Sequence, residues 1–155
     1  MSIRIITPAT GSITRRGVQM PSCMLRVSGS TAKVRKFLAE SSLQPVRVFW
    51  KGQPGVIQSR GPIQTSGFNI TLSRAEGLPA QARRAVRFMR KHRDDMLLIR
   101  SLGFSSVTLD FGLYDLATED RPWPSYRLPT TLVQLAAELG CNIDLSFYGA
   151  APHES

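Results

Sequence analysis

Carboxylates are almost missing from the first half of this 155-residue chain. Residues 1–75 contain eleven Arg or Lys residues and a single acidic residue, Glu40, whereas residues 101–155 contain seven acidic residues and only two basic ones. Because the formal net charge is +9 at pH 7, the molecule is expected to be basic and electrically polarised. Such a field attracts polyanions or an acidic protein surface, but charge alone identifies neither the partner nor the fold.

Cysteines and long apolar runs are also scarce. Only Cys23 and Cys141 occur, far apart and outside any CxxC or paired-histidine motif, so the sequence predicts neither a disulfide framework nor a zinc site. No apolar run approaches the roughly 20 residues that a membrane-spanning helix needs. We therefore expect a protein of the reducing cytoplasm that has no membrane partner.

Catalytic signatures are absent from the sequence, which contains no GxSxG, P-loop or GxGxxG motif. Asp110 and Asp144 fall on one side of two predicted strands and could act as an acid and base pair, but cross-strand ion pairs with Arg26 or Arg47 explain them more simply. His92 lies on the apolar side of a predicted helix, without an acidic residue at metal-ligand spacing. We therefore predict a protein that is not an enzyme and that binds no cofactor or metal.

The two ends of the chain are predicted to stand apart from the domain. Residues 1–20 form a basic lead-in that is flexible or strand-like, and the segment SIRIIT within it could form an edge strand. This lead-in has neither the apolar core nor the cleavage site of a secretory signal. A true start at Met20 or Met24 is an alternative. Residues 151–155 are predicted to be a disordered tail.

A single domain over residues 21–150 follows from the apolar periodicity. Alternation of apolar and polar residues predicts strands, and a period of 3.6 residues predicts helices. The second predicted helix is either continuous or split at Asp94 and Asp95, and Gly140 ends the third. The predicted strands are residues 23–29, 45–52, 67–73, 105–114 and 142–149, and the predicted helices are residues 32–42, 79–102 and 128–139.

Strands with one apolar face can cover a core on one side only. The order βαββαβαβ therefore predicts an α/β (α+β) fold, a two-layer sandwich in which helices cover one face of a single, mostly antiparallel sheet of about five strands. One sequence does not determine the strand order. The uncovered face is expected to display polar and aromatic side chains, namely Arg26, Arg47, Phe49, Lys51, Asn69, Thr71, Asp110, Tyr114, Asp144, Ser146 and Tyr148.

Several stretches resemble a family of small uncharacterised bacterial domains over roughly residues 22–149. They are the VSG that ends the first strand of this domain, the KG that ends the next, RFMRKHRDDMLLIRSLG before VTLDFGLY, and LPTTLVQLAAELGCNIDLSFYG. The resemblance implies an α/β domain and transfers no active residue. Because related small α/β families serve as immunity proteins beside bacterial toxins, it also favours that role.

The leading hypothesis is a non-enzymatic protein-binding module, in its most specific form an immunity protein that neutralises a toxin by occlusion. Basic side chains along the second predicted helix would steer an acidic or weakly charged protein, and an aromatic side chain would anchor it. Nuclease toxins are commonly basic, so we expect a less basic target of another activity. The predicted contact residues are Arg83, Arg84, Arg87, Arg90, Lys91 and Trp123.

The alternative hypothesis is an RNA or single-stranded nucleic-acid-binding domain that uses the basic helix together with the sheet face. Arginines beside aromatic rings combine phosphate attraction with base stacking. No RNP or helix-turn-helix motif accompanies them, and two carboxylates on the same face would repel phosphates. The residues of this alternative site are Arg26, Arg47, Phe49, Lys51, Asp110, Tyr114, Asp144 and Tyr148.

Overall fold

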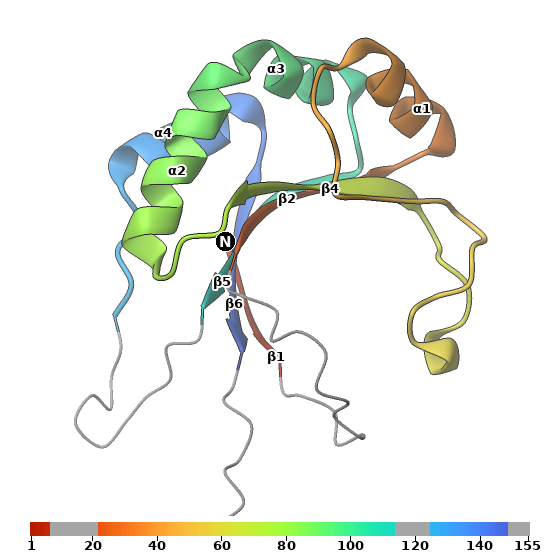
Figure 1. The fold of residues 1–155 in the computed structure, drawn as a ribbon, viewed down its shortest axis with the longest axis horizontal. Helices are drawn as coiled ribbons and strands as arrows, with labels where there is room; N and C mark the ends of the chain where they lie inside the picture. Colours follow the sequence, from red (N-terminus) through yellow and green to blue (C-terminus); the bar gives the residue numbers. More distant parts are fainter. Residues whose placement is uncertain (7–21, 114–124, 149–155) are drawn as a thin grey trace, which may run out of the picture.

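The computed structural model describes residues 1–6, 22–113 and 125–148. In this part of the chain, α-helices lie along one side of a single curved sheet, and no helix covers the other side (Figure 1). This arrangement confirms the predicted α/β architecture with helices on one face of one sheet. We call the side without helices the open face.

Each predicted strand and helix is present, with small shifts in its bounds. The second predicted strand shortens to three residues, and the second predicted helix is split in two. The strands are β1 (Ser2–Ile6), β2 (Cys23–Gly29), β3 (Arg47–Phe49), β4 (Ser66–Ser73), β5 (Ser106–Leu113) and β6 (Asn142–Tyr148), and the helices are α1 (Thr31–Glu40), the 3-10 turn η1 (Gln58–Arg60), α2 (Leu78–Lys91), α3 (Arg93–Leu102) and α4 (Thr130–Leu139).

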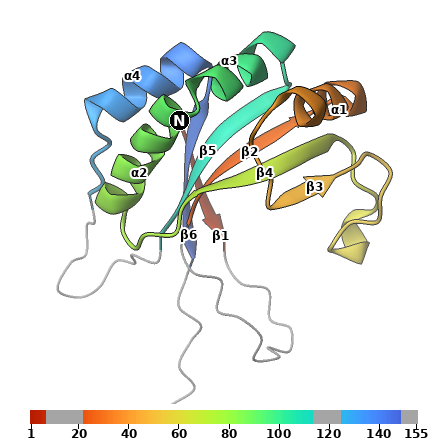
Figure 2. The ribbon, with the colours of Figure 1, turned by 45° about the horizontal axis from the view of Figure 1, so that its top comes forward.

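The strand order across the sheet is β1-β6-β5-β2-β4-β3. The units β2-α1-β3 and β4-α2-α3-β5 each join two parallel strands with one strand of the other unit between them, which is the interlocked βαββαβ arrangement of ferredoxin-like folds. Strand β6 then follows α4 and pairs in parallel with β5 (Figure 2). Strand β1 pairs in parallel with β6 and forms the edge.

The prediction of about five mostly antiparallel strands was therefore wrong in detail, because the sheet has six strands and mixed pairing. A crossover through a helix between two adjacent strands makes them parallel, and α4 makes such a crossover between β5 and β6. The sixth strand is Ser2–Ile6, the segment for which an edge strand was one of the predicted outcomes.

Local sequence signals set the helix ends. The Ser30 hydroxyl accepts a hydrogen bond from the backbone N–H of Lys33 at 3.4 Å and caps α1. Gly140 ends α4 with φ of 72°, in the left-handed region that glycine tolerates. The break between α2 and α3 falls at His92, two residues before the acidic pair in the first turn of α3.

The core lies between the helices and the sheet face that they cover. The rings of Phe37 in α1 and Phe68 in β4 stack 4.4 Å apart, and Phe104 meets Phe68 edge-on. Met89 in α2 and Met96 in α3 are completely buried beside them. Burial of such large apolar side chains is the main source of stability, at about 1.5–3 kcal/mol each.

Candidate binding surfaces

Helix α2 has its basic and its apolar side chains on opposite sides. Its buried residues pack toward β4 and α4. At 3.6 residues per turn, its basic residues fall within an arc of about 120° on the outer side of the helix. We call this surface the α2 basic face; it consists of Arg83, Arg84, Arg87, Arg90 and Lys91.

All five side chains of the α2 basic face are exposed. None of them forms a hydrogen bond or an ion pair with another residue in the described part of the chain. Asp94 and Asp95 follow at helical spacing, but neither pairs with Arg90 or Lys91. The helix therefore presents a compact group of unneutralised positive charges to solvent. Trp123, the predicted anchor, lies outside the described residues, as does Tyr114.

The junction of α2 and α3 is hollowed, with a volume of about 460 Å³. The Asp95 carboxylate accepts hydrogen bonds from the Ser41 hydroxyl at 2.6 Å and from the Ser42 backbone and hydroxyl at 3.1 and 3.0 Å. Burial raises the pKa of Asp95, but these hydrogen bonds outweigh it, so the pKa is lowered overall. Both charge signs line the hollow: Glu40, Ser42, Arg90, Lys91, His92, Arg93, Asp94 and Asp95.

His92 has a structural position in this hollow. Its ring lies 4.5 Å from that of Phe88, and its Nδ1 is 3.9 Å from the Asp95 carboxylate. Within the described ranges, no group of three potential metal ligands gathers anywhere. His92 is thus a half-buried side chain at a helix junction, close to the packed position that the sequence predicted.

The open face carries polar residues in rows that run across the strands. The register aligns Arg47 of β3, Asn69 of β4 and Arg26 of β2 in one row. A neighbouring row contains Asp110 of β5 and Asp144 of β6. Positive charge therefore gathers toward the β3 edge of this face, and the carboxylates lie toward β6.

The two carboxylates are not displayed as the sequence analysis predicted. Asp110 is 6% exposed, Asp144 is 9% exposed and Ser146 is 2% exposed. Side chains of the same face lie against Asp110: Arg26 forms an ion pair with it at 2.6 Å, and the Ser146 hydroxyl donates a hydrogen bond to it at 2.6 Å. The cross-strand ion pair predicted for Arg26 is confirmed, whereas Arg47 forms no ion pair within the described segments.

Two aromatic rings of the open face each reach over a glycine of the neighbouring strand. A Cβ added to Gly67 of β4 would lie 2.4 Å from the Phe49 ring and 2.2 Å from the Val27 carbonyl oxygen. A Cβ on Gly112 of β5 would lie 3.1 Å from the Tyr148 ring. The Phe49 ring therefore occupies space that a Cβ at position 67 would fill, whereas the contact of the Tyr148 ring with Gly112 is tight but less severe. Sequence reasoning missed Gly67, although a glycine within a strand pattern is a known sign of close approach.

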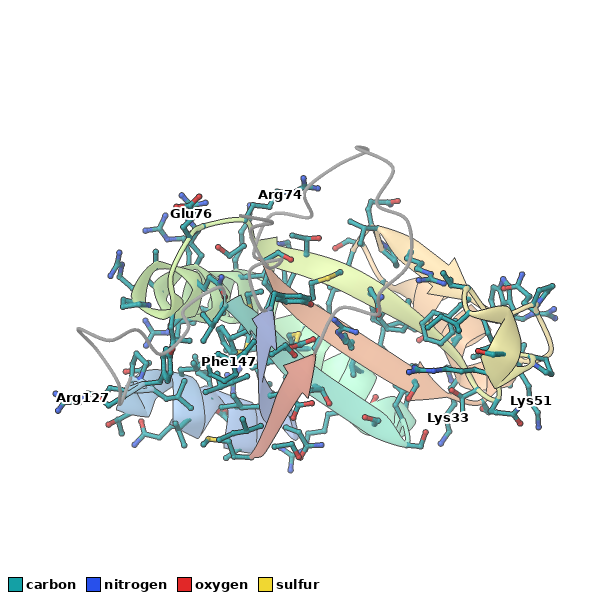
Figure 3. The ribbon with its side chains drawn as sticks, turned by 90° about the horizontal axis from the view of Figure 1, so that it is seen from below. Lys33, Lys51, Arg74, Glu76, Arg127 and Phe147 are labelled. Carbon is teal, nitrogen blue, oxygen red and sulfur yellow. The ribbon has the colours of Figure 1, made fainter. Side chains whose placement is uncertain are left out.

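Residues 50–65, which we call the β3–β4 arm, are held in place by backbone hydrogen bonds. Gly52 N–H donates to the Ile63 carbonyl, and Ile63 N–H donates to the Gln53 carbonyl, both at 2.8 Å. The arm projects at the end of the molecule remote from α2, and Figure 3 shows Lys51 at this end. Lys51 and Arg60 are exposed, and neither side chain has a partner among residues with a described position.

The two cysteines are unsuited to act as nucleophiles at neutral pH. Both are free thiols. Burial, and to a lesser degree the nearby Asp110 charge, strongly raises the pKa of Cys23. Burial raises the pKa of Cys141 to about 11. Because the thiolate is the reactive form, both thiols are poor nucleophiles at neutral pH.

Comparison with known proteins adds no identification. No family model matches this chain, and no curated protein or solved structure is similar to it at a significant level. In the part of the chain that the structure describes, no helix is long and apolar enough to cross a membrane.

Proposed function

We propose that this protein is a non-enzymatic binding module whose α2 basic face docks an acidic protein partner. The observation that carries the proposal is the set of five exposed cations, on one arc of one helix, that have no hydrogen-bond or ion-pair partner among the described residues. Four of the five are arginines. Arginine forms bidentate hydrogen bonds with carboxylates and is enriched at protein interfaces. Their field would raise the rate of association more than the final affinity.

The layout of the surface favours a protein partner over a nucleic acid at α2. The α2 basic face contains no aromatic side chain on which a base could stack. The register places the aromatic rings Phe49 and Tyr148 on the open face, on the side of the sheet away from α2, so a short single strand would not contact these rings and the α2 basic face together. Exposed Glu76 and Asp94 flank the helix and would repel an extended phosphate backbone.

In its most specific form, the proposal is that α2 occludes the active site of a bacterial toxin; the resemblance to small bacterial α/β domains favours an immunity role but assigns no residue to it. The charge of the module then requires a toxin with an acidic or weakly charged surface. We place this interaction in the cytoplasm, where the free thiols Cys23 and Cys141 would persist.

The experiment is a crossed comparison of two triple variants that change the net charge equally. The first is Arg83→Glu, Arg87→Glu and Arg90→Glu in α2. The control reverses three exposed cations at the other end of the molecule, Arg47→Glu, Lys51→Glu and Arg60→Glu. Binding of a fluorescein-labelled, glutamate-rich 15-residue peptide is followed by anisotropy at about 0.1 M salt, where exposed charges still interact over about 10 Å.

The proposal predicts that the α2 triple weakens peptide binding by about tenfold or more, and that the control triple has a much smaller effect. The difference should shrink as salt is raised. Equal loss in both triples would mean that net charge rather than α2 controls binding, and would overturn the proposal.

A further inference from the structure

We propose that the open face near β3 is a second binding site, which takes single-stranded RNA with one base stacked on Phe49. This surface lies away from α2 and does not depend on the proposed docking of a protein there. The inference rests on three features of the described residues: an aromatic ring on the sheet surface, free cations around it, and buried carboxylates.

The first feature is the position of Phe49. Its ring extends from the edge strand β3 over Gly67 of β4, in space that a Cβ would fill. Residue Phe49 as a whole is half-buried, so some of its surface meets solvent. A fixed ring on an open sheet is the kind of platform on which single-stranded bases stack, with little dependence on sequence.

The second feature is the charge around the ring. Arg47 lies two residues before Phe49 and occupies the same face, in the row of Asn69 and Arg26. Lys51 and Arg60 belong to the β3–β4 arm that follows. Arg47, Lys51 and Arg60 are exposed and form no ion pair within the described ranges, and residues 41–75 contain no acidic residue at all.

The third feature is the burial of the two carboxylates on this face. Asp110 and Asp144 would repel phosphates if they were exposed on this face, as the sequence suggested. They are 6% and 9% exposed, and the Arg26 guanidinium neutralises Asp110 at 2.6 Å. The carboxylates also lie on β5 and β6, whereas Arg47 lies on the edge strand β3, and Lys51 and Arg60 lie on the β3–β4 arm that follows it. A phosphate chain near Phe49 therefore meets an uncompensated positive field.

A protein partner fits this surface less well. The core of a protein interface is apolar and closely packed. On the strands next to Phe49, the same face offers Arg47, Asn69 and Ser28. Exposed apolar side chains occur beside these strands, at Val46 before β3 and at Val56 and Ile57 in the β3–β4 arm. On the strands themselves, an aromatic ring beside a cation and an amide matches the combination of base stacking and phosphate contact.

The test measures binding of a fluorescein-labelled RNA decamer, oligo(U), by anisotropy over a range of salt concentrations. Phe49→Leu keeps an apolar side chain over Gly67 but removes the aromatic ring on which a base would stack. Phe49→Tyr keeps an aromatic ring in that place. We expect Phe49→Leu to weaken binding by about five- to fiftyfold and Phe49→Tyr to bind like the unmodified chain. The RNA association constant should fall as salt is raised. In Arg47→Gln, the slope of its logarithm against the logarithm of the salt concentration should be less steep by about 0.7.

The two triple variants of the previous section complete the design. The triple at Arg47, Lys51 and Arg60 should abolish RNA binding, and the α2 triple should leave most of it. Circular dichroism and a thermal melt confirm that each variant is folded. The proposal is overturned if Phe49→Leu binds RNA like the unmodified chain, if the α2 triple alone removes binding, or if inorganic polyphosphate of equal charge binds as tightly as RNA.

Discussion

The guanidinium of Arg26 lies 2.6 Å from the carboxylate of Asp110, and it joins β2 to β5 across the open face. The Asp110 side chain is 9% exposed and that of Arg26 is 48% exposed, so solvent screens one partner but not the other. Loss of the arginine would leave a nearly buried carboxylate with only Ser146 as a hydrogen-bond donor among the interactions described.

Arg26→Gln should therefore lower the free energy of unfolding by about 1–3 kcal/mol, less than for a fully buried pair because water reaches the guanidinium. Urea unfolding at pH 7 measures this difference. The double variant Arg26→Gln with Asp110→Asn should recover part of the loss, because no buried charge remains unpaired. An unchanged unfolding midpoint for Arg26→Gln would contradict this account of the open face.

Gly67→Ala should destabilise the fold by about 1–3 kcal/mol, because the new Cβ would meet the Val27 carbonyl oxygen at 2.2 Å as well as the Phe49 ring. The matched control is Gly112→Ala, whose Cβ would have its nearest contact at 3.1 Å. Thermal unfolding should show a larger loss of stability for Gly67→Ala than for Gly112→Ala. Adding Phe49→Ala to Gly67→Ala should not restore stability, since a backbone oxygen cannot move aside as a ring can; full recovery would show that the ring was the sole obstacle.

Asp95 should make stability depend on pH in the acid range. Since its folded pKa is lowered, the carboxylate contributes stability above the unfolded pKa of about 3.9, and this contribution is lost as the pH falls through the folded value. Asp95→Asn should cost about 1–2 kcal/mol at pH 7, where charge-assisted hydrogen bonds from Ser41 and Ser42 are weakened. Urea titrations at pH 7 and pH 3 should show the difference shrinking at the lower pH. An equal difference at both values would mean that the charge of Asp95 is unimportant.

Cys141 should be alkylated by iodoacetamide roughly a hundredfold more slowly than an exposed thiol at pH 7.5, because a pKa of about 11 leaves little thiolate. Cys23, which is completely buried, should react more slowly still. Mass spectrometry of timed samples measures both rates, with the urea-unfolded chain as the control in which both cysteines react. Rapid labelling of Cys141 in the folded protein would show that its surroundings are more open than the structure indicates.

Local features of the fold could be predicted because they depend on neighbours in sequence. The alternation that buries Leu25 and Val27 and exposes Arg26 is contained within β2 itself. Ser30 caps the helix that follows it, and Gly140 ends α4. Such signals act over two to four residues, which is why the strands and helices were found within a few residues of their observed bounds.

Other features depend on contacts between distant segments and could not be read from one sequence. Strand order decides that β1 pairs with β6, about 140 residues away, and that both faces of β5 are buried. Asp110 and Asp144 were predicted to be displayed but are buried, and the Arg26 and Ser146 side chains that contact Asp110 come from other strands. The hydrogen bonds from Ser41 and Ser42 to Asp95 likewise join positions more than 50 residues apart.

The α2 basic face was predicted as a group of residues, since helical spacing places them together. What the sequence could not provide was that Arg83, Arg87 and Arg90 form no ion pair with a described residue, even though carboxylates line the same hollow as Arg90. This absence of partners in the described structure, rather than the basic composition alone, is the basis of the proposed docking surface.

The most direct test of that surface is to ask what the tagged protein retains in mild salt from its native host, and to repeat the purification with the α2 triple and with the triple at Arg47, Lys51 and Arg60. Mass spectrometry of the eluates identifies any protein present in a one-to-one ratio. The account predicts an acidic protein companion that the unmodified chain and the control triple retain and that the α2 triple loses. Retention of the same companion by the α2 triple would contradict the account, as would an eluate in which nucleic acid held by α2 is the only stoichiometric partner.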